Sequence, residues 1–462
     1  MRIFNTETVD KIGQEVELKG WVNARRDMGK ITFLDLRDRS GLLQVVGVPS
    51  ELDEKSLEEI KRARLEYLVE MHGVVQARGA KQQNAELPTG KVEVLAKSFK
   101  VISESSAMPF EVDGDTKNIS EELRLKYRYL DLRSERMKKN LEVRHTGNLF
   151  FRNYLSSLGF WEIETPYLTK GTPEGAREFI VPSRLYPGEF YVLPQSPQQF
   201  KQLLMVGGAE KYFQIARCFR DEDQRGDRQP EFTQLDLEVS FTDQEEILNL
   251  MEKMIMKLVE ENFSHLKIQK KPFPRLTYAE AQKKYNSDKP DLRKDKTDKT
   301  ELAFAWVTDF PLFERSETED KLVSTHHPFT RPQDEDLKLL DKSPEKVRSF
   351  AYDLVLNGFE IGGGSLRIFD GALQKKIFEI LGLDEKEINS RFGHMLEAFT
   401  FGVPPHGGLA LGLDRLYAIL QNEENIREVI PFPKTGDAKD LMMGAPSPLP
   451  EQALKDVHIK KS

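Results

Sequence analysis

Apolar and polar residues alternate in five short runs within the first 105 residues of the chain. These runs are residues 15–26, 31–37, 42–48, 67–78 and 91–102. A period of two residues is typical of strands that have one buried face. A charged run at residues 51–63 has helical character instead and separates the third strand from the fourth. Five short strands with a helix at this point predict an OB barrel over residues 1–105, with another small β-barrel as the alternative.

A different pattern begins after this region. Residues 106–130 carry a proline, a glycine and several acidic residues, which is typical of a linker or hinge. From residue 131 onward, apolar residues such as Met137 and Leu155 recur at helical spacing, and Gly159 follows as a residue that ends a helix. Strand-like and helical runs then alternate towards the end. We therefore expect a larger second domain over residues 131–462 and an α+β fold class.

Two of these runs, residues 212–220 and 232–239, carry the most informative pattern in the chain. Their odd positions, such as Phe213 and Leu235, are apolar, so one face of each strand is expected to pack. The other face presents Arg220, Gln234, Asp236 and Glu238. Charges aimed in one direction beside an arginine-rich loop indicate a site for an anionic, phosphorylated ligand. A polar hairpin on the surface is the alternative.

An Asn-Gly pair at residues 357–358 is typical of a two-residue hairpin turn. Such a turn places Asp353 and Glu360 on the same face, one diagonal apart. Two carboxylates in this arrangement can share a Mg²⁺ ion that is held on phosphates. Arg367 lies seven residues past Glu360 and would face away in a regular strand. We therefore predict a β-bulge within residues 362–364 that returns Arg367 to the site.

Two further segments combine the start of a helix with polar chemistry. Ser196 followed by Pro197 predicts a helix with Ser196 as its N-cap. A glycine-rich strand runs into a second predicted helix near Asp414, where Arg415 follows. Backbone amides at a helix N-terminus favour phosphate, and an arginine there adds a fork of donors.

Composition narrows the classes of protein that fit these patterns. The chain has 462 residues, of which 39% are hydrophobic and 31% charged, and this is ordinary for a soluble globular protein of two or three domains. No run of about 18 apolar residues is present, so no membrane span is expected. The first residues lack the apolar core of a secretory signal, and Cys218 is the only cysteine, so we expect a cytoplasmic protein without disulfides. The net charge of −8 argues against nonspecific coating of nucleic acid.

Three stretches carry a resemblance to a known family. Residues 218–238, CFRDEDQRGDRQPEFTQLDLE, resemble motif 2 of the class II aminoacyl-tRNA synthetases in its aspartyl form. Residues 401–416 resemble motif 3, and residues 159–166, which end at Pro166, resemble motif 1. The resemblance runs across nearly the whole chain and is specific to the bacterial type of aspartyl-tRNA synthetase, in subclass b.

The resemblance implies a fold and an activity. The fold would join an OB-fold anticodon-binding domain over residues 1–105 to a class II catalytic domain over residues 131–462, built on an antiparallel β-sheet with flanking helices. The activity would be that of an aspartate–tRNA ligase. ATP and Mg²⁺ would activate L-aspartate to aspartyl-adenylate, and the aspartyl group would pass to the 3′ end of tRNA-Asp, with AMP and diphosphate as products. Members of the family pair as homodimers around the motif 1 proline, here Pro166.

The resemblance also assigns residues to ATP. Arg220 would contact the α-phosphate, Phe232 would stack on adenine, and Arg415 would bind the γ-phosphate. Arg220, Arg415 and Glu360 would be the catalytic residues, and Asp353 with Glu360 would hold Mg²⁺. The whole ATP site would be Arg220, Asp221, Glu222, Gln229, Phe232, Glu360, Gly412, Leu413, Asp414 and Arg415.

Aspartate would be held by a second set of residues. Lys201 and Arg367 resemble the pair that binds its side-chain carboxylate, where asparagine would leave buried positive charge uncompensated and glutamate is one methylene too long. Asp236 and Glu174 would take the ammonium group, and the segment around Glu174 would move as a lid. The family has the same pair of adjacent histidines, and the resemblance implies that the first, His326, contacts aspartate. A zinc site is disfavoured, because adjacent histidines project differently and no thiol is near. The full set is Glu174, Ser196, Gln198, Lys201, Arg220, Gln234, Asp236, His326 and Arg367.

In the predicted barrel, the positions that match anticodon-reading residues of the family are Arg25, Arg26, Phe33, Gln44 and Glu93. Phe33 would stack on a base, Gln44 and Glu93 would bond to base edges, and the two arginines would meet phosphates. Some bacterial members also charge tRNA-Asn, and their barrel often has histidine where this chain has Met28. Met28 therefore leans towards discrimination for tRNA-Asp, with tRNA-Asn as an open alternative.

The chain departs from the bacterial pattern in one respect. Bacterial members usually carry an inserted domain between motifs 2 and 3, but here a short charged junction, residues 289–302, stands in that place. All catalytic positions remain, so we expect the chain to be active. The missing domain contacts the acceptor side of tRNA in the family, so we expect its absence to affect the affinity for tRNA more than the chemical steps.

Two other hypotheses stay open. The first is a relative that activates asparagine or lysine, which the combination of Lys201, Arg367 and His326 disfavours. The second is a non-catalytic RNA-binding paralogue, which the presence of both Arg220 and Arg415 disfavours.

Overall fold

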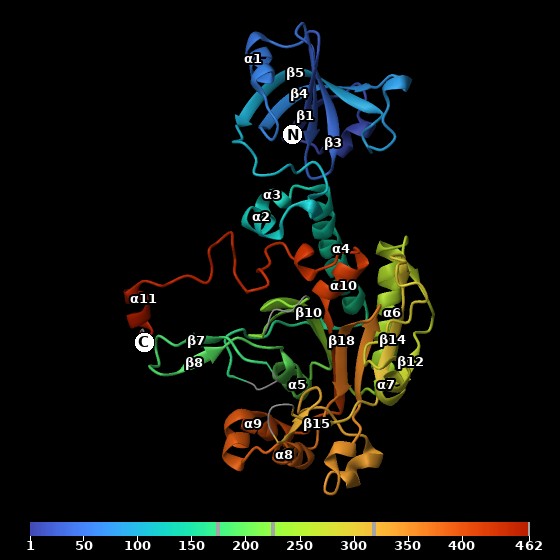
Figure 1. Cartoon of the computed structure of the whole chain (residues 1–462), viewed down its shortest axis with the longest axis vertical. Coiled ribbons are helices and arrows are strands. Elements are labelled where there is room, and N and C mark those ends of the chain that lie inside the picture. The colour runs from blue at the N-terminus through green and yellow to red at the C-terminus, as the bar shows by residue number, and fades with distance from the viewer. Residues whose placement is uncertain (172–175, 223–226, 317–319, 461–462) are drawn as a thin grey trace. The chain divides into compact units, whose positions relative to one another are not determined.

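The structure of the protein is a computed structural model that describes residues 1–171, 176–222, 227–316 and 320–460. The chain divides into two compact units (Figure 1). The first consists of residues 1–119 and 133–138, and the second of residues 120–132 and 139–462.

The first unit is built around a closed five-stranded barrel with the strand order β1-β2-β3-β5-β4. Its elements are η1 (Asn5–Asp10), β1 (Glu15–Met28), β2 (Ile31–Arg37), β3 (Leu42–Gly47), α1 (Glu54–Arg62), β4 (Leu68–Ala77), η2 (Ala80–Gln82), β5 (Val92–Ser103) and η3 (Thr116–Asn118). Inward-facing residues such as Leu18 and Val94 are fully buried, as alternation along each strand requires. Asp53 caps α1 by accepting a bond from the amide of Ser56. The predicted OB barrel is confirmed.

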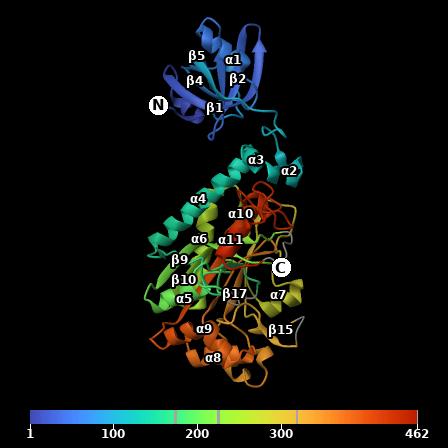
Figure 2. The ribbon, with the colours of Figure 1, turned by 90° about the vertical axis from the view of Figure 1, so that its left-hand side faces the viewer.

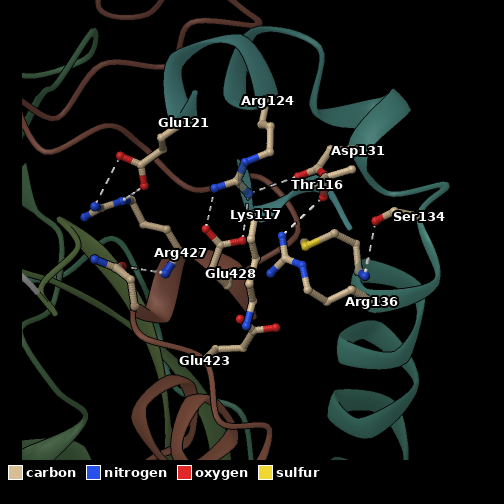
Figure 3. A network of polar contacts seen from close by, with 12 residues as sticks. Thr116, Lys117, Glu121, Arg124, Asp131, Ser134, Arg136, Glu423, Arg427 and Glu428 are labelled. Atoms are coloured by element: carbon tan, nitrogen blue, oxygen red, sulfur yellow. Dashed lines mark hydrogen bonds and ion pairs between the residues drawn. The ribbon is translucent and has the colours of Figure 1, made fainter. Parts of the chain in front are cut away.

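The helices that follow are α2 (Glu121–Lys126), α3 (Arg128–Asp131) and α4 (Glu135–Ser157). Gly159 follows α4 with a φ of 82°, a left-handed conformation that suits glycine at the end of a helix. Arg124 in α2 donates to both carboxylate oxygens of Glu428, each at 2.8 Å, and lies 3.4 Å from Asp131 (Figure 3). These buried ion pairs hold α2 and α3 against η6 (Ile426–Glu428), on the same unit.

An eight-stranded sheet forms the centre of the second unit, in the order β12-β14-β17-β18-β19-β10-β9-β6. The strands are β6 (Trp161–Glu162), β9 (Lys211–Phe219), β10 (Glu231–Ser240), β12 (Arg275–Thr277), β14 (Phe304–Thr308), β17 (Ala351–Leu356), β18 (Phe359–Leu366) and β19 (His406–Gly412). All neighbours from β14 to β9 are antiparallel, as predicted, whereas the two edge strands, β12 and β6, pair in parallel.

Helices cover one face of this sheet, and the hydrophobic core lies between them and the sheet. The helices α4, α6 (Gln244–Asn262) and α10 (Leu413–Leu420) lie beside the strands of the sheet (Figure 2). Their apolar side chains join those of the sheet in one hydrophobic cluster. The remaining helices are α5 (Gln198–Val206), α7 (Tyr278–Tyr285), α8 (Gly371–Ile380), α9 (Glu385–Phe399), α11 (Glu451–Asp456), η4 (Asp334–Leu339) and η5 (Pro344–Lys346). Short strands outside the sheet are β7 (Ile180–Pro182), β8 (Phe190–Val192), β11 (Lys267–Ile268), β13 (Glu301–Leu302), β15 (Phe313–Arg315) and β16 (Leu322–Ser324).

The bulge that was predicted within residues 362–364 lies one residue earlier. Leu354 pairs with Gly362 and Val355 pairs with Glu360, so Ile361 is the extra residue, and pairing is regular through the glycines. The glycines serve a different need. A Cβ on Gly364 would lie 2.1 Å from the carbonyl oxygen of Gly408, so only glycine allows β18 and β19 to approach this closely.

The predicted start of the helix after Ser196 is also off by one residue. The helix α5 begins at Gln198, and Pro197 occupies the N-cap position without a side-chain hydrogen bond. Ser196 therefore does not cap this helix. Pro197, with ψ at 22°, stands outside the first helical turn, and this shifts the helix start by one residue.

Candidate active site

One cavity of about 640 Å³ opens on the face of the sheet that the helices of the core leave uncovered. Most of the residues predicted for ATP, aspartate and Mg²⁺ line this cavity. These are Ser196, Gln198, Lys201, Arg220, Glu222, Gln229, Phe232, Gln234, Asp236, His326, Asp353, Glu360, Arg367, Gly412, Asp414 and Arg415. Alternation in β10 explains much of this, because Phe232, Gln234 and Asp236 face the cavity while Leu235 and Leu237 are buried in the core.

Two of the predicted residues, Asp221 and Leu413, do not line the cavity, and the structure does not describe a third, Glu174. The side chain of Leu413 is fully buried in the hydrophobic core, so only its backbone is left to meet a ligand. Asp221 pairs with Arg177 in an isolated bridge, and its amide donates to the Arg177 carbonyl at 3.0 Å. Glu174, and with it the predicted lid, falls in residues 172–175, which lie outside the described part of the chain.

Two arginines mark one end of the cavity. The guanidinium of Arg220 lies 5.0 Å from the centre of the Phe232 ring, and its Nε is buried without a hydrogen-bond partner among the described residues. Arg415 lies 2.8 Å from Asp227 and donates to the backbone carbonyl of Glu360. Cationic groups on one wall and an aromatic ring beside them suit a nucleotide.

Neighbouring polar residues hold this wall in place. Asp414 accepts a bond from the amide of Thr233 at 2.8 Å and pairs with Arg144, so its carboxylate ties α10 to β10. The side-chain amide of Gln229 accepts from the backbone amide of Lys434 at 2.7 Å and donates to the Lys434 carbonyl at 2.9 Å. These two side chains therefore anchor the segments that carry Arg415 and Arg220.

A buried network of charges marks the other end of the cavity. The ammonium group of Lys201 lies 2.6 Å from Asp236 and 3.4 Å from Glu238. Arg367 donates to Glu238 through Nε at 2.9 Å and Nη2 at 3.1 Å. All four side chains are at most 2% exposed.

This network corrects the predicted charge balance. Lys201 and Arg367 were expected to rely on a substrate carboxylate, but two carboxylates of the protein already face them, because charges buried without partners are strongly unfavourable. Oδ2 of Asp236 has no hydrogen-bond partner in the described structure and lies free for a further donor. Glu238 was expected on the same polar strand face as Asp236 but was assigned to neither ATP nor aspartate.

The two adjacent histidines have different environments. His326 Nε2 lies 3.2 Å from Asp353; burial alone would lower the pKa of His326, but the charge of Asp353 outweighs it and raises this pKa. His327 Nε2 lies 2.7 Å from Arg367, and burial together with the Arg367 charge holds the pKa of His327 well below its usual range. His327 is therefore neutral and accepts a hydrogen bond from Arg367, a contact that sequence reasoning missed.

Asp353 and Glu360 converge on Gly363. A Cβ at Gly363 would lie 2.6 Å from Asp353 Oδ1 and 3.7 Å from Glu360 Oε1, so the absent side chain leaves room between them. The nearby Asp353 charge, together with burial, raises the pKa of Glu360. Two close carboxylates fit Mg²⁺, which takes one or two protein carboxylates and completes its shell with phosphates and water. Among the described residues, no group of three or more His, Cys, Asp or Glu side chains is arranged to hold a metal alone.

In the barrel, four of the five predicted anticodon residues make polar side-chain contacts, in three separate sets. Gln44 donates to Glu93 at 2.7 Å and accepts from Arg78 at 3.2 Å, and Arg78 was missed by the sequence prediction. Arg25 donates to three backbone carbonyls at the end of α1, at 2.7 to 3.1 Å, so its guanidinium caps that helix. Arg26 pairs with Asp35 at 3.0 Å, and its side chain is 56% exposed.

Comparison with known proteins decides the family. Residues 120–436 match the profile of the tRNA synthetases class II (D, K and N), and residues 16–102 match that of an OB-fold nucleic acid binding domain. The "Aspartate--tRNA(Asp/Asn) ligase" of Rubrobacter xylanophilus is 42% identical over 97% of this chain and 94% of its own length. The "Aspartate--tRNA ligase" of Listeria monocytogenes is 42% identical over 97% of this chain and 96% of its own. The chain belongs to the aspartate–tRNA ligases of the class II synthetase family.

Structural comparison supports the fold of this aspartate–tRNA ligase. The asparaginyl-tRNA synthetase from Pyrococcus horikoshii, solved with asparaginyl-adenylate, aligns with a TM-score of 0.75 and 25% identity, over 94% of this chain and 98% of its own. The alignment with the Rubrobacter protein spans 571 residues against the 462 of this ligase, so that relative carries residues without a counterpart here. In the described part of the ligase, no helix is long and apolar enough to cross a membrane.

Proposed function

We propose that this aspartate–tRNA ligase uses ATP to activate L-aspartate and then transfers the aspartyl group to the 3′ end of tRNA-Asp. One observation carries the proposal. A single cavity joins a wall with Arg220, Phe232 and Arg415 to a buried end with Lys201 and Arg367. A nucleotide and a small dicarboxylic amino acid would then lie side by side, in the geometry that adenylation needs.

Activation needs positioning and charge neutralisation rather than an enzyme nucleophile. The α-carboxylate of aspartate attacks the α-phosphorus of ATP, an oxygen–phosphorus bond forms, and the bond to diphosphate breaks. Arg220 would stabilise the charge that develops on the α-phosphate, and Arg415 that on the leaving diphosphate. In the second step, the terminal ribose hydroxyl of tRNA attacks the mixed anhydride, and AMP leaves.

Magnesium would be held by Asp353 and Glu360. When bound, the ion would neutralise charge on the ATP phosphates. The convergence of both carboxylates on Gly363 supports this assignment, and the nearby Asp353 charge together with burial raises the pKa of Glu360. His326 contacts Asp353 and would orient that carboxylate.

The choice of amino acid would depend on the buried network. The side-chain carboxylate of aspartate would lie against Lys201 and Arg367, while its ammonium group would meet the free Oδ2 of Asp236. Asparagine would present an uncharged amide, which makes weaker hydrogen bonds to the two cations than a carboxylate does, and the NH₂ group of that amide would face their donors. Ser196, Gln198 and Gln234 would add polar contacts around the substrate.

The choice of tRNA is the finer point. The barrel residues Phe33, Gln44 and Glu93 would read the anticodon by stacking and hydrogen bonds. Similar proteins carry names of both kinds, aspartate–tRNA ligase and aspartate–tRNA(Asp/Asn) ligase. We propose first that the enzyme charges tRNA-Asp and rejects tRNA-Asn, because Met28 stands where enzymes that charge both often have histidine. Charging of both tRNAs is the second proposal.

Assembly as a homodimer around Pro166 is part of the proposal. Large apolar side chains near Pro166 are exposed in the single chain, with Trp161 at 65%, Leu168 at 54% and Tyr167 at 44%. An apolar surface of this kind is typical of a protein interface. Light scattering should give the mass of two chains; a mass of one chain would contradict this part.

Aspartate-dependent exchange of labelled diphosphate into ATP tests the first step. Arg220→Ala should abolish the exchange, because it would remove the cation that stands beside Phe232 on this wall of the cavity. Arg217→Ala is the matched control, since Arg217 lies on β9, the strand that ends just before Arg220, but pairs with Glu231 outside the cavity. Exchange that persists in Arg220→Ala would refute the assigned role.

Charging of tRNA-Asp and tRNA-Asn transcripts with labelled aspartate tests the second step. Charging of tRNA-Asp alone would support the discriminating enzyme. Charging of both transcripts would support the second proposal and make Met28 a poor guide. Exchange without charging of either transcript would refute transfer to tRNA.

A further inference from the structure

The charged junction of residues 289–302 lies within and just after the segment that joins α7 to β13, residues 286–300, and this segment starts at the rim of the candidate active site. Asp288 lines the cavity. Asp291 packs against the turn between β17 and β18, where a Cβ on Gly358 would lie 3.2 Å from the Asp291 Cβ. Gln269 donates to the carbonyl of Leu292 at 3.0 Å. These contacts hold the junction beside the cavity, although the proposed adenylation chemistry does not use it.

The end of the junction repeats the sequence Asp-Lys-Thr, at residues 295–297 and 298–300. In the first copy, Asp295 accepts bonds from the amide and hydroxyl of Thr297 at 2.9 and 2.6 Å. In the second, Asp298 accepts from the amide and hydroxyl of Thr300 at 2.7 and 2.8 Å. Each aspartate therefore bonds within its own turn, although both carboxylates remain exposed, and a lysine follows each of them in sequence.

The positive groups of the junction are left exposed. Lys294, Lys296 and Lys299, which we call the junction lysines, are exposed, and none has an ion pair with another described residue. Arg293, by contrast, is neutralised by Asp291 at 2.9 Å. Lys267 lies next to the junction, because its backbone amide donates to the carbonyl of Thr300 at 2.8 Å. Its side chain is also exposed.

We propose that the junction lysines form a binding surface for the phosphate backbone of the acceptor arm of tRNA. The inference rests on the proposed function, because the 3′ end of tRNA must then enter the cavity that Asp288 borders. Exposed ammonium groups on long stems contact phosphates without reading sequence. The chain as a whole has a net charge of −8, so a local positive surface beside the cavity would direct the acidic RNA to this edge.

The test compares two triple variants with equal changes in charge. K294A/K296A/K299A removes the junction lysines, and K338A/K342A/K346A removes three exposed lysines of the segment around η4 and η5. Filter binding measures the Kd of a tRNA-Asp transcript over a series of salt concentrations. We expect the first variant to bind roughly tenfold more weakly near physiological salt, with a slope of log K against log salt that is smaller by about 2 to 3. The control variant should stay within about twofold of the parent protein.

Further measurements separate this surface from a folding defect and from the proposed function. A K294R/K296R/K299R variant keeps the charge and should bind like the parent protein. Aspartate-dependent exchange should persist in the alanine variant, because that step needs no tRNA. An unchanged Kd and salt slope in the alanine variant, or equal weakening in the control, would overturn the inference. If the parent protein showed no exchange, the proposed function would fail, while the binding comparison would still decide this surface.

Discussion

Glu238 allows the charge balance of the buried network to be tested directly. Its fully buried carboxylate accepts two hydrogen bonds from Arg367, at 2.9 and 3.1 Å, and lies 3.4 Å from Lys201. Glu238→Gln keeps the shape of the side chain and removes its charge. The network would then hold two cations against the single carboxylate of Asp236.

The expected cost follows from the burial of the pair. Removing one partner of a buried ion pair costs about 3 to 5 kcal/mol, because the other charge is left uncompensated. We expect the lower value, about 3 kcal/mol, since glutamine still accepts one bond and His327 and Ser365 also contact Arg367. In a unit of this size, each kcal/mol of lost unfolding free energy lowers the Tm by about 1.5 °C. The Tm of the second unit should therefore fall by roughly 4 °C near pH 7.5.

The pH dependence gives an independent check. Burial would raise the pKa of Glu238, but the charges of Arg367 and Lys201 outweigh it and lower this pKa below 4.5. A carboxyl group with a lowered folded pKa contributes stability above its unfolded pKa, and this contribution is lost as the pH falls through the folded pKa. The difference in Tm between the two proteins should therefore be constant from about pH 6 to 8 and shrink below about pH 4.5.

Scanning calorimetry measures the shift, and a second buried carboxylate supplies the control. Glu252 accepts a bond from the amide of Phe273 at 3.0 Å and has no cationic partner among the described residues. Glu252→Gln should therefore cost less than about 1 kcal/mol. Glu238→Gln should also leave Arg367 less well oriented towards aspartate. A loss of about 1.4 kcal/mol in binding would raise the KM for aspartate roughly tenfold in the exchange assay. A Tm shift below about 1 °C at pH 7.5 would refute the reasoning.

Two further substitutions test other parts of the chain. Gly363→Ala should raise several-fold the Mg²⁺ concentration for half-maximal exchange, because its Cβ would lie 2.6 Å from Asp353 Oδ1, whereas Gly371→Ala has no atom within 4 Å and should change nothing. An unchanged Mg²⁺ requirement in Gly363→Ala would contradict the metal assignment. Arg25→Ala should lower the Tm of the barrel by several degrees, since about 1 to 2 kcal/mol is lost with its bonds to the end of α1. Arg26→Ala, at an exposed pair, should shift it little, and equal shifts in both would argue against a capping role for Arg25.

Much of the fold and of the cavity wall could be predicted from the sequence because it depends on local geometry. Side chains alternate along any strand, so the positions of Phe232, Gln234 and Asp236 on one face followed from their spacing. The Asn-Gly pair likewise set the turn, since Asn357 and Gly358 both have positive φ, at 52° and 87°. These features need only a few neighbouring residues.

The tertiary structure decided the features that depend on distant partners. The extra residue of the bulge is Ile361 rather than a glycine, because the glycines are needed where β18 passes close to β19. Leu413 lies in the core beneath the glycine-rich strand, a position that a linear motif does not distinguish from its neighbours. The partners of Lys201 and Arg367 come from β10, tens of residues away from either. A buried charge is stable only beside an opposite charge, and which distant carboxylate meets it is settled when the sheet assembles.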